Sequence, residues 1–175
     1  DSFGEDCLAG AMKGFKQTKL EPVTVIKADR SKPDYAAIVP QLIKENAQAV
    51  IWIGSSVAVS DGVKALRKAG SAMQVVTVSN NASSGFAKQL GEAVRGVIVT
   101  QVFPNERSMG YAINREAAAL VKADGGVTIS PSVMEGFASA KVLVEGLRRA
   151  GPKPTREKVV AALSGLNHFD LGGLE

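Results

Sequence analysis

Two polar turns in this 175-residue chain carry side chains that could bind a small molecule. Gly54-Ser55-Ser56 follows the apolar run Ala49–Ile53, and Ser79-Asn80-Asn81 follows the run Gln74–Val78. Hydroxyls and backbone N–H groups at the start of a helix suit a carboxylate or a carbonyl group. An Asn amide can accept a hydrogen bond from an amine, although it supplies no opposite charge. The chemistry indicated is reversible binding through hydrogen bonds.

The same residues also have structural interpretations. Ser is a preferred helix N-cap, so capping is the alternative role of Ser55 or Ser56, and both roles can coexist at one turn. Asn tolerates a left-handed backbone, and turn geometry alone could account for Asn80 and Asn81. The sequence leaves these alternatives open.

Catalytic chemistry finds little support in the sequence. The single His168 lies in the C-terminal tail, with no Cys, Ser or acidic partner indicated. One Cys and one His are a poor basis for a metal site. The Gly54-Ser55-Ser56 turn lacks the Gly-Lys-Ser/Thr ending of a phosphate-binding loop. We predict no catalytic residue, no metal and no cofactor. An enzyme is the minority alternative, because α/β folds host many reactions.

The net charge of +4 is mild and argues against a nucleic-acid partner. The basic residues recur at helical spacing on amphipathic segments, as Lys64, Arg67 and Lys68 do, and aromatic residues do not interleave with them. Such a pattern is typical of solvated helix faces.

Apolar runs alternate with helical patterns up to about residue 102. Runs that are apolar on both faces are typical of strands inside a sheet covered by helices on both sides. Strict alternation favours parallel βαβ units, in which ligands bind at the carboxyl ends of the strands. The predicted fold class is α/β, a parallel sheet with helices on both faces. Strands are expected at Val23–Ile26, Ala49–Ile53, Gln74–Val78 and Gly96–Val102.

After Pro104 the sequence predicts helices alone, at about residues 108–123, Pro131–Ala150 and Thr155–Ser164. The middle helix carries an apolar stripe that includes Val133, Phe137 and Val144, and the remaining sequence offers no evident sheet to cover it. We therefore expect part of the structure to be missing, and we expect the exposed stripes to drive self-association.

Several stretches resemble the type I periplasmic solute-binding proteins, in the branched-chain amino-acid receptor group that includes leucine/isoleucine/valine-binding proteins. The resemblance covers nearly the whole chain and depends on the order and spacing of diffuse motifs. These motifs are Asp1–Glu5, Ala49–Gly54, Lys64–Gly70, Gly96–Pro104, Pro131–Gly151 and Asn167–Gly172.

This resemblance implies an incomplete two-lobe architecture. Residues 1–103 would form most of the second ligand-binding lobe, 104–166 the helices returning to the first lobe, and 167–175 the crossover back to the second lobe. Phe103, Pro104 and Asn105 would form a hinge between the lobes, which requires only residues that absorb backbone rotation.

The resemblance also assigns ligand contacts to three turns. The first position falls on Phe3, for which packing on the first helix is the alternative. The second falls on Ser55, Ser56 or Val57. The third falls on Asn80 and Asn81, where the amino-acid receptors place an acidic residue against the ligand ammonium. Because that charge is missing here, an amide, or a carboxylic acid that lacks an amine, is an alternative class of ligand.

The function implied is a non-catalytic, extracytoplasmic receptor of an ABC importer. It would work in the periplasm, where it would capture an amino acid or a related small polar or carboxylate ligand and deliver it to a membrane permease. We expect no signal peptide in this chain. The alternatives are a ligand-sensing domain of a receptor or transcription regulator, or binding of a non-amino-acid carboxylate or amide.

Overall fold

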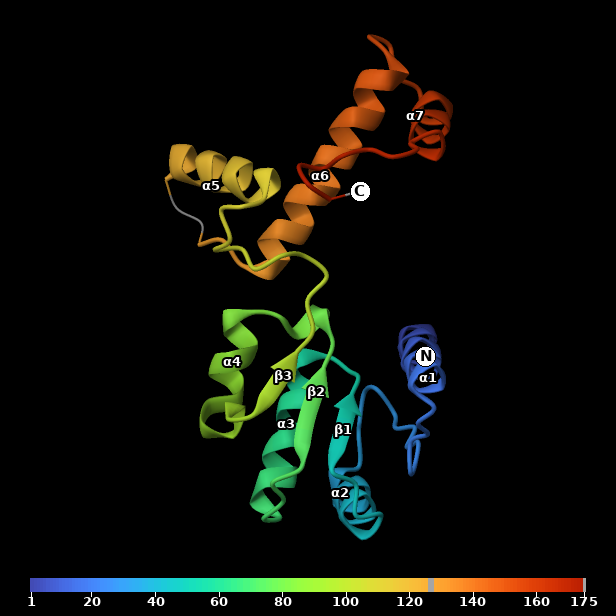
Figure 1. Cartoon of the computed structure of the whole chain (residues 1–175), viewed down its shortest axis with the longest axis vertical. Coiled ribbons are helices and arrows are strands. Elements are labelled where there is room, and N and C mark those ends of the chain that lie inside the picture. Colours follow the sequence, from blue (N-terminus) through green and yellow to red (C-terminus); the bar gives the residue numbers. More distant parts are fainter. Residues whose placement is uncertain (126–127, 175) are drawn as a thin grey trace. The chain divides into compact units, whose positions relative to one another are not determined.

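The computed structural model describes residues 1–125 and 128–174 and divides into two compact units, Asp1–Thr100 and Gln101–Glu175 (Figure 1). The first unit alternates helices and strands. Its elements are α1 (Ser2–Thr18), α2 (Tyr35–Lys44), β1 (Ala49–Trp52), α3 (Ser56–Lys68), β2 (Gln74–Thr77), the 3-10 helix η1 (Ser79–Asn81), α4 (Ser84–Leu90), the 3-10 helix η2 (Gly91–Val94) and β3 (Val97–Val99).

The sheet of the first unit is parallel, and its strand order β1-β2-β3 follows the order of the chain. Ile51 of β1 is aligned with Val76 of β2, and Val76 is aligned with Ile98 of β3. The predicted α/β class with a parallel sheet is therefore confirmed.

Capping side chains fix where three helices of this unit begin. Asp34, Ser55 and Ser83 each precede a helix, and each side chain accepts a hydrogen bond from a backbone N–H in the first turn. Such a cap satisfies one of the donors that a helix start leaves unpaired. The capping role considered for Ser55 is thus confirmed, and it leaves the hydroxyl proton of Ser55 unused by the cap.

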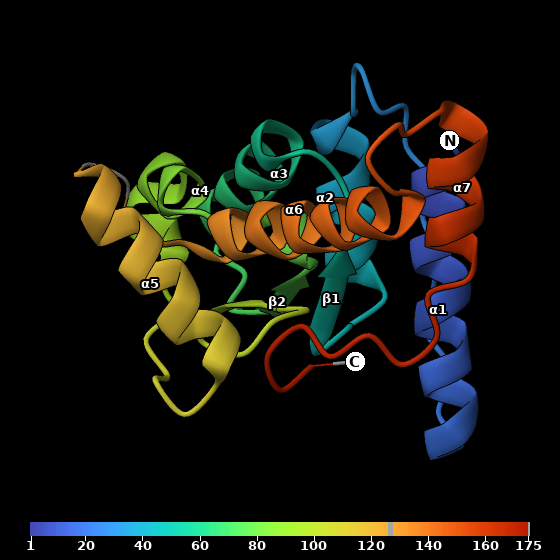
Figure 2. The ribbon, with the colours of Figure 1, turned by 90° about the horizontal axis from the view of Figure 1, so that it is seen from above.

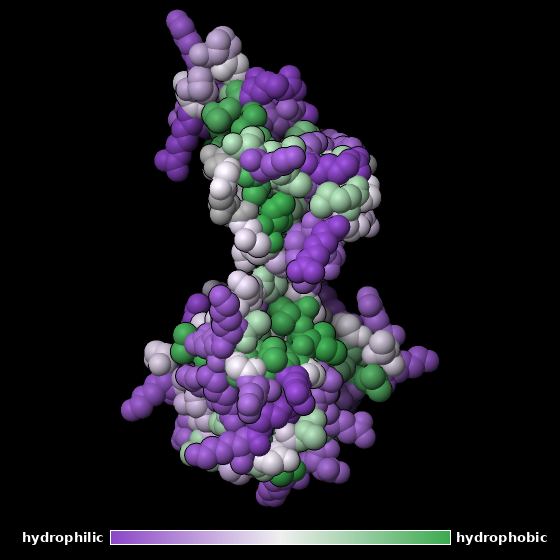
Figure 3. Space-filling model, turned by 90° about the vertical axis from the view of Figure 1, so that its left-hand side faces the viewer, coloured by the Kyte–Doolittle hydropathy of each residue, from purple (hydrophilic) through white to green (hydrophobic). Residues whose placement is uncertain are grey.

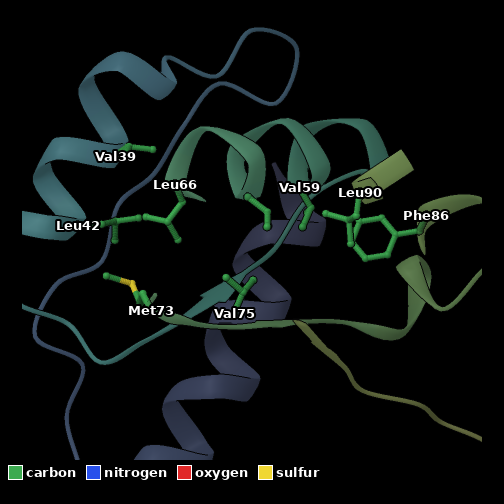
Figure 4. Close-up of a cluster of buried hydrophobic side chains, with 9 residues drawn as sticks. Val39, Leu42, Val59, Leu66, Met73, Val75, Phe86 and Leu90 are labelled. Carbon is green, nitrogen blue, oxygen red and sulfur yellow. The ribbon is translucent and has the colours of Figure 1, made fainter. Parts of the chain in front are cut away.

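The core of the first unit lies between the sheet and helices α2, α3 and α4. In Figure 4, side chains from all three helices converge above Val75 of β2, which is fully buried. Burying a Val, Leu or Phe side chain contributes about 1.5–3 kcal/mol. Trp52 packs against this cluster, as expected for a residue within a strand.

Coverage of the two sheet faces is unequal. Helices α2, α3 and α4 lie on one side of the sheet in Figure 2. On the opposite face, the aligned residues Ile51 and Ile98 are 42% and 51% exposed, and Val76 between them is half-buried. A row of apolar side chains across three strands therefore remains open.

The prediction of a strand at Val23–Ile26 is wrong. A strand needs a hydrogen-bonded neighbour, and β1 pairs only with β2 among the described residues. The segment keeps the alternating exposure of an extended chain, and Ile26 packs against the core. Lys27, which follows the segment, forms an ion pair with Glu5 of α1, with Nζ 2.8 Å from a carboxylate oxygen.

The second unit is helical and contains α5 (Ala112–Asp124), α6 (Pro131–Ala150) and α7 (Arg156–Ser164). The bounds predicted for α6 are confirmed. Its Met134 and Ala138 form a core with Ile113 and Ala117 of α5. Farther along α6, Val144 is 63% exposed. Figure 3 shows hydrophobic residues, in green, at the surface of both units.

Glu145 is expected to make the second unit sensitive to acid. Its carboxylate lies 2.8 Å from Nε of Arg148 and 2.6 Å from Nε of Arg149, and these hydrogen bonds lower the pKa of Glu145 from 4.5 to about 2. Because the pKa is depressed in the folded state, the stabilisation is present above pH 4.5 and is lost as the pH falls towards 2.

Thermal unfolding of the protein and of Glu145→Gln, measured at several pH values from about 6 down to about 2, checks this effect. The unfolding temperature of the variant should be lower than that of the unchanged protein at the highest pH. The two unfolding temperatures should converge at the lowest pH. A constant difference across the range would contradict the assignment.

Candidate functional site

The two polar turns meet at the carboxyl edge of the sheet. They follow the adjacent parallel strands β1 and β2, so both lie at the same edge. Hydrogen bonds join them: Asn80 Nδ2 donates to the Gly54 carbonyl oxygen at 3.0 Å, and Asn81 Nδ2 donates to the same oxygen at 3.3 Å. The two turns therefore lie side by side at this edge.

Asn81 is completely buried and uses both ends of its amide. Its Oδ1 accepts a hydrogen bond from the Ser56 hydroxyl at 2.9 Å, and its Nδ2 also donates to Thr77 Oγ1 at 2.9 Å. The Thr77 hydroxyl in turn donates to the Trp52 carbonyl oxygen at 2.8 Å. Buried polar groups require such partners, because an unpaired one costs about 1–3 kcal/mol.

Ser55 and Asn80 retain unused hydrogen-bonding capacity. Ser55 Oγ accepts from the Ala58 N–H at 3.3 Å, which leaves its hydroxyl proton available. Within residues 1–125 and 128–174, neither that proton nor Asn80 Oδ1 has a partner. Val57, in the first turn of α3, is 57% exposed and offers an apolar surface beside them. The edge thus presents one donor, one acceptor and one apolar group.

Phe3 lies in the first turn of α1, where Asp1 Oδ1 caps the helix by accepting from the Gly4 N–H at 2.9 Å. Its side chain is 36% exposed. Phe3 takes no part in the hydrogen-bond network of the two turns, and its contact with a ligand stays a prediction.

The residues proposed as a hinge are held within the second unit. Phe103 packs against the core of that unit. The Asn105 carbonyl oxygen accepts from Asn114 Nδ2 and from the Ser108 N–H, both at 2.8 Å. The Thr100 N–H still donates to the Thr77 carbonyl oxygen of the first unit at 2.9 Å. Residues 101–102 lie between these two attachments.

Thr77 and Asn114 were not singled out from the sequence, yet both are fully buried polar residues. The signal for Thr77 was its place inside an apolar strand, four residues before Asn81, where a hydroxyl needs a partner. Asn114 gave a similar signal within the apolar pattern of α5. Neither spacing specifies the partner, because the partners come from other elements.

A cavity of ≈ 320 Å³ lies at the other, amino-terminal edge of the sheet and is lined by Arg67, Gly70, Ser71, Ala72, Gln74, Arg95 and Gly96. The guanidinium of Arg67 is engaged there, because its Nη1 donates to the carbonyl oxygens of Ser71 and Met73. In open α/β sheets ligands bind at the carboxyl ends of the strands. The two polar turns are therefore the better candidate site.

Among the described residues, no three His, Cys, Asp or Glu side chains are grouped so that they could hold a metal ion. None of the described helices combines the length and the apolar character needed to cross a membrane.

The sequence profile of the periplasmic binding proteins matches residues 1–174. The chain belongs to this family. No curated protein sequence matches it. Among solved structures, the chain is similar to a substrate-binding periplasmic protein from Ralstonia solanacearum, with 31% identity and a TM-score of 0.83 over 99% of this chain and 50% of that one.

Two further solved structures share the fold at lower identity. A leucine-binding protein from Thermotoga maritima is 18% identical, with a TM-score of 0.70, over 87% of this chain and 43% of that one. A fatty acid ABC transporter substrate-binding protein from Thermomonospora curvata is 20% identical, with a TM-score of 0.75, over 98% of this chain and 45% of that one.

The resemblance to type I periplasmic binding proteins is thus confirmed, and the solved structures named above are described as binding proteins. The periplasmic binding protein chain described here spans about half the length of the solved structures it matches.

Proposed function

We propose that this chain is part of the solute-binding receptor of an ABC importer. The receptor works outside the cytoplasm, in the periplasm, and it captures its ligand without catalysis and presents it to a membrane permease. The observation that carries the proposal is the pair of polar turns, at Gly54–Val57 and Ser79–Asn81, at one edge of a parallel sheet in a chain of this family.

We infer that the receptor binds its ligand by enclosing it between two lobes. The unit Asp1–Thr100 would supply most of one lobe. The unit Gln101–Glu175, in which Phe103, Leu171 and Leu174 pack against the core, would supply part of the other lobe. Closing the lobes removes water from apolar surface and strengthens the few hydrogen bonds made to the ligand. The open apolar row of the sheet and the exposed stripe of α6 are expected to drive self-association of this chain where nothing covers them.

The proposed ligand is an amino acid or a related small carboxylate or amide. The Ser55 hydroxyl can donate to a carboxylate or carbonyl oxygen, and Asn80 Oδ1 can accept from an amine or amide N–H. Val57 and Phe3 would contact an apolar side chain of the ligand. Asn80 carries no charge, so a carboxylate without an amine is also accommodated.

Isothermal titration calorimetry of the whole protein against four ligand classes tests the proposal. The classes are aliphatic α-amino acids, their amides, short aliphatic or aromatic acids, and a long-chain fatty acid. We expect saturable binding to at least one of the first three classes, with no chemical change in the recovered ligand. Binding to none of them would contradict the proposal, and turnover of a bound compound would indicate an enzyme.

A ligand-sensing domain of a receptor or regulator is the second candidate. Ligand binding would then change the activity of a signalling or DNA-binding partner. Pull-down of the ligand-loaded protein with a permease, compared with a signalling or DNA-binding partner, separates the two.

A further inference from the structure

The amide of Asn81 bonds to residues on three consecutive elements. Its partners are the Ser56 hydroxyl of α3, the Gly54 carbonyl oxygen of the turn before α3, and Thr77 Oγ1 of β2. The Thr77 hydroxyl extends the network to β1 through the Trp52 carbonyl oxygen. The ends of two strands and both polar turns are therefore joined through one buried side chain.

These bonds decide which polar atoms remain for a ligand. The Ser56 hydroxyl proton is donated to Asn81 Oδ1, so it does not point to the open edge. The Gly54 carbonyl oxygen accepts hydrogen bonds from Nδ2 of Asn81 and from Nδ2 of Asn80. Of the Asn80 amide, Oδ1 therefore remains available to a ligand. The hydroxyl of Ser56 and the carbonyl oxygen of Gly54 are therefore engaged within the network, whereas the hydroxyl proton of Ser55 and Oδ1 of Asn80 stay available to a ligand.

We propose that Asn81 is a positioning residue: its amide holds the β1–α3 turn against the β2–η1 turn and fixes the separation of the Ser55 hydroxyl and Asn80 Oδ1. A carboxamide is required, because the residue must accept one hydrogen bond and donate two. The consequence for ligand binding rests on the proposed function. The coupling between the two turns does not.

Hydrogen-exchange mass spectrometry on the whole protein without ligand tests the coupling. In Asn81→Ala, backbone amides of residues 54–58 and 77–82 are expected to exchange about tenfold faster, because the bonds that restrain local opening are gone. The matched control is Asn80→Ala, which removes an exposed amide with a single bond to Gly54. It should change exchange in these segments by less than about twofold.

Ser56→Ala removes the outermost bond of the network with little risk to folding. It should accelerate exchange in the same two segments, and it should add nothing further in the Asn81→Ala background. Uniformly faster exchange throughout the first unit would overturn the proposal, because it would mark a general loss of stability. Equal effects of Asn81→Ala and Asn80→Ala would also overturn it.

L-Leucine serves as the probe for the binding arm. Asn81→Ala should weaken leucine binding, while Ser55 and Asn80 remain intact. If the unchanged protein shows no leucine binding but the exchange results hold, leucine is not its ligand and the coupling by Asn81 stands. If leucine binds equally well to the unchanged protein and to Asn81→Ala, the positioning role is overturned.

Discussion

Gly62→Ala is expected to lower the free energy of unfolding by about 2–3 kcal/mol, because it overpacks the contact between α3 and β1. A Cβ atom at position 62 would lie 2.6 Å from Cη2 of Trp52 and 2.8 Å from its Cε2. The indole ring has little freedom to retreat, since it packs against the core and lies 6.3 Å from the ring of Tyr35, centroid to centroid. The Tyr35 hydroxyl is itself bonded to the Ala58 carbonyl oxygen at 2.7 Å.

Denaturant-induced unfolding measures the loss, and Gly10→Ala in α1 is the matched control. A Cβ at position 10 meets nothing within 4 Å, so the helix propensity of Ala should raise stability by about 0.5–1 kcal/mol. An increase in stability in both variants would show that α3 and Trp52 are not packed as closely as described.

Asn80→Asp is expected to change the ligand preference of the site by about tenfold or more in favour of amine-bearing ligands, relative to acids without an amine. Asn80 is exposed, so the carboxylate is readily solvated and the fold should tolerate it. The new charge attracts an ammonium group and repels a second carboxylate at the same edge of the sheet. Calorimetric titration of the whole protein with an α-amino acid and with its deaminated acid measures the ratio of affinities.

Asn46→Asp is the control for net charge. Asn46 is exposed at the end of α2, just before β1, and therefore lies at the amino-terminal edge of the sheet. Its left-handed backbone (φ 53°) is one that Asp also tolerates. If both variants gained the same preference for amine-bearing ligands, the cause would be a long-range effect of charge. Asn80 would then not be a ligand contact.

Local signals in the sequence were sufficient for most helices. Pro131 and Gly151 mark the ends of α6, and Ser55 and Gly70 mark those of α3, because capping depends on residues within one turn. The run Val23–Ile26 carried an equally clear strand signal, yet it forms no strand. Pairing requires a neighbour supplied by another part of the chain, and propensity says nothing about that neighbour.

The candidate site was predictable as a location but not in its atomic roles. The order of strands and turns placed Ser55 and Asn80 at one edge of a parallel sheet. The sequence Asn80-Asn81 does not indicate which of the two amides is buried, because that depends on the packing of η1 against Thr77 and Ser56. Buried partners are determined by tertiary structure, and so Thr77 escaped notice.

The match between strand order and chain order has a consequence for synthesis. As the polypeptide leaves the ribosome, β1, β2 and β3 emerge in the sequence in which they pair, so each new strand finds its template already made. Each pairing spans a single crossover, which keeps the contact order lower than pairing between strands out of chain order would. The first unit can therefore grow one strand at a time in the direction of translation.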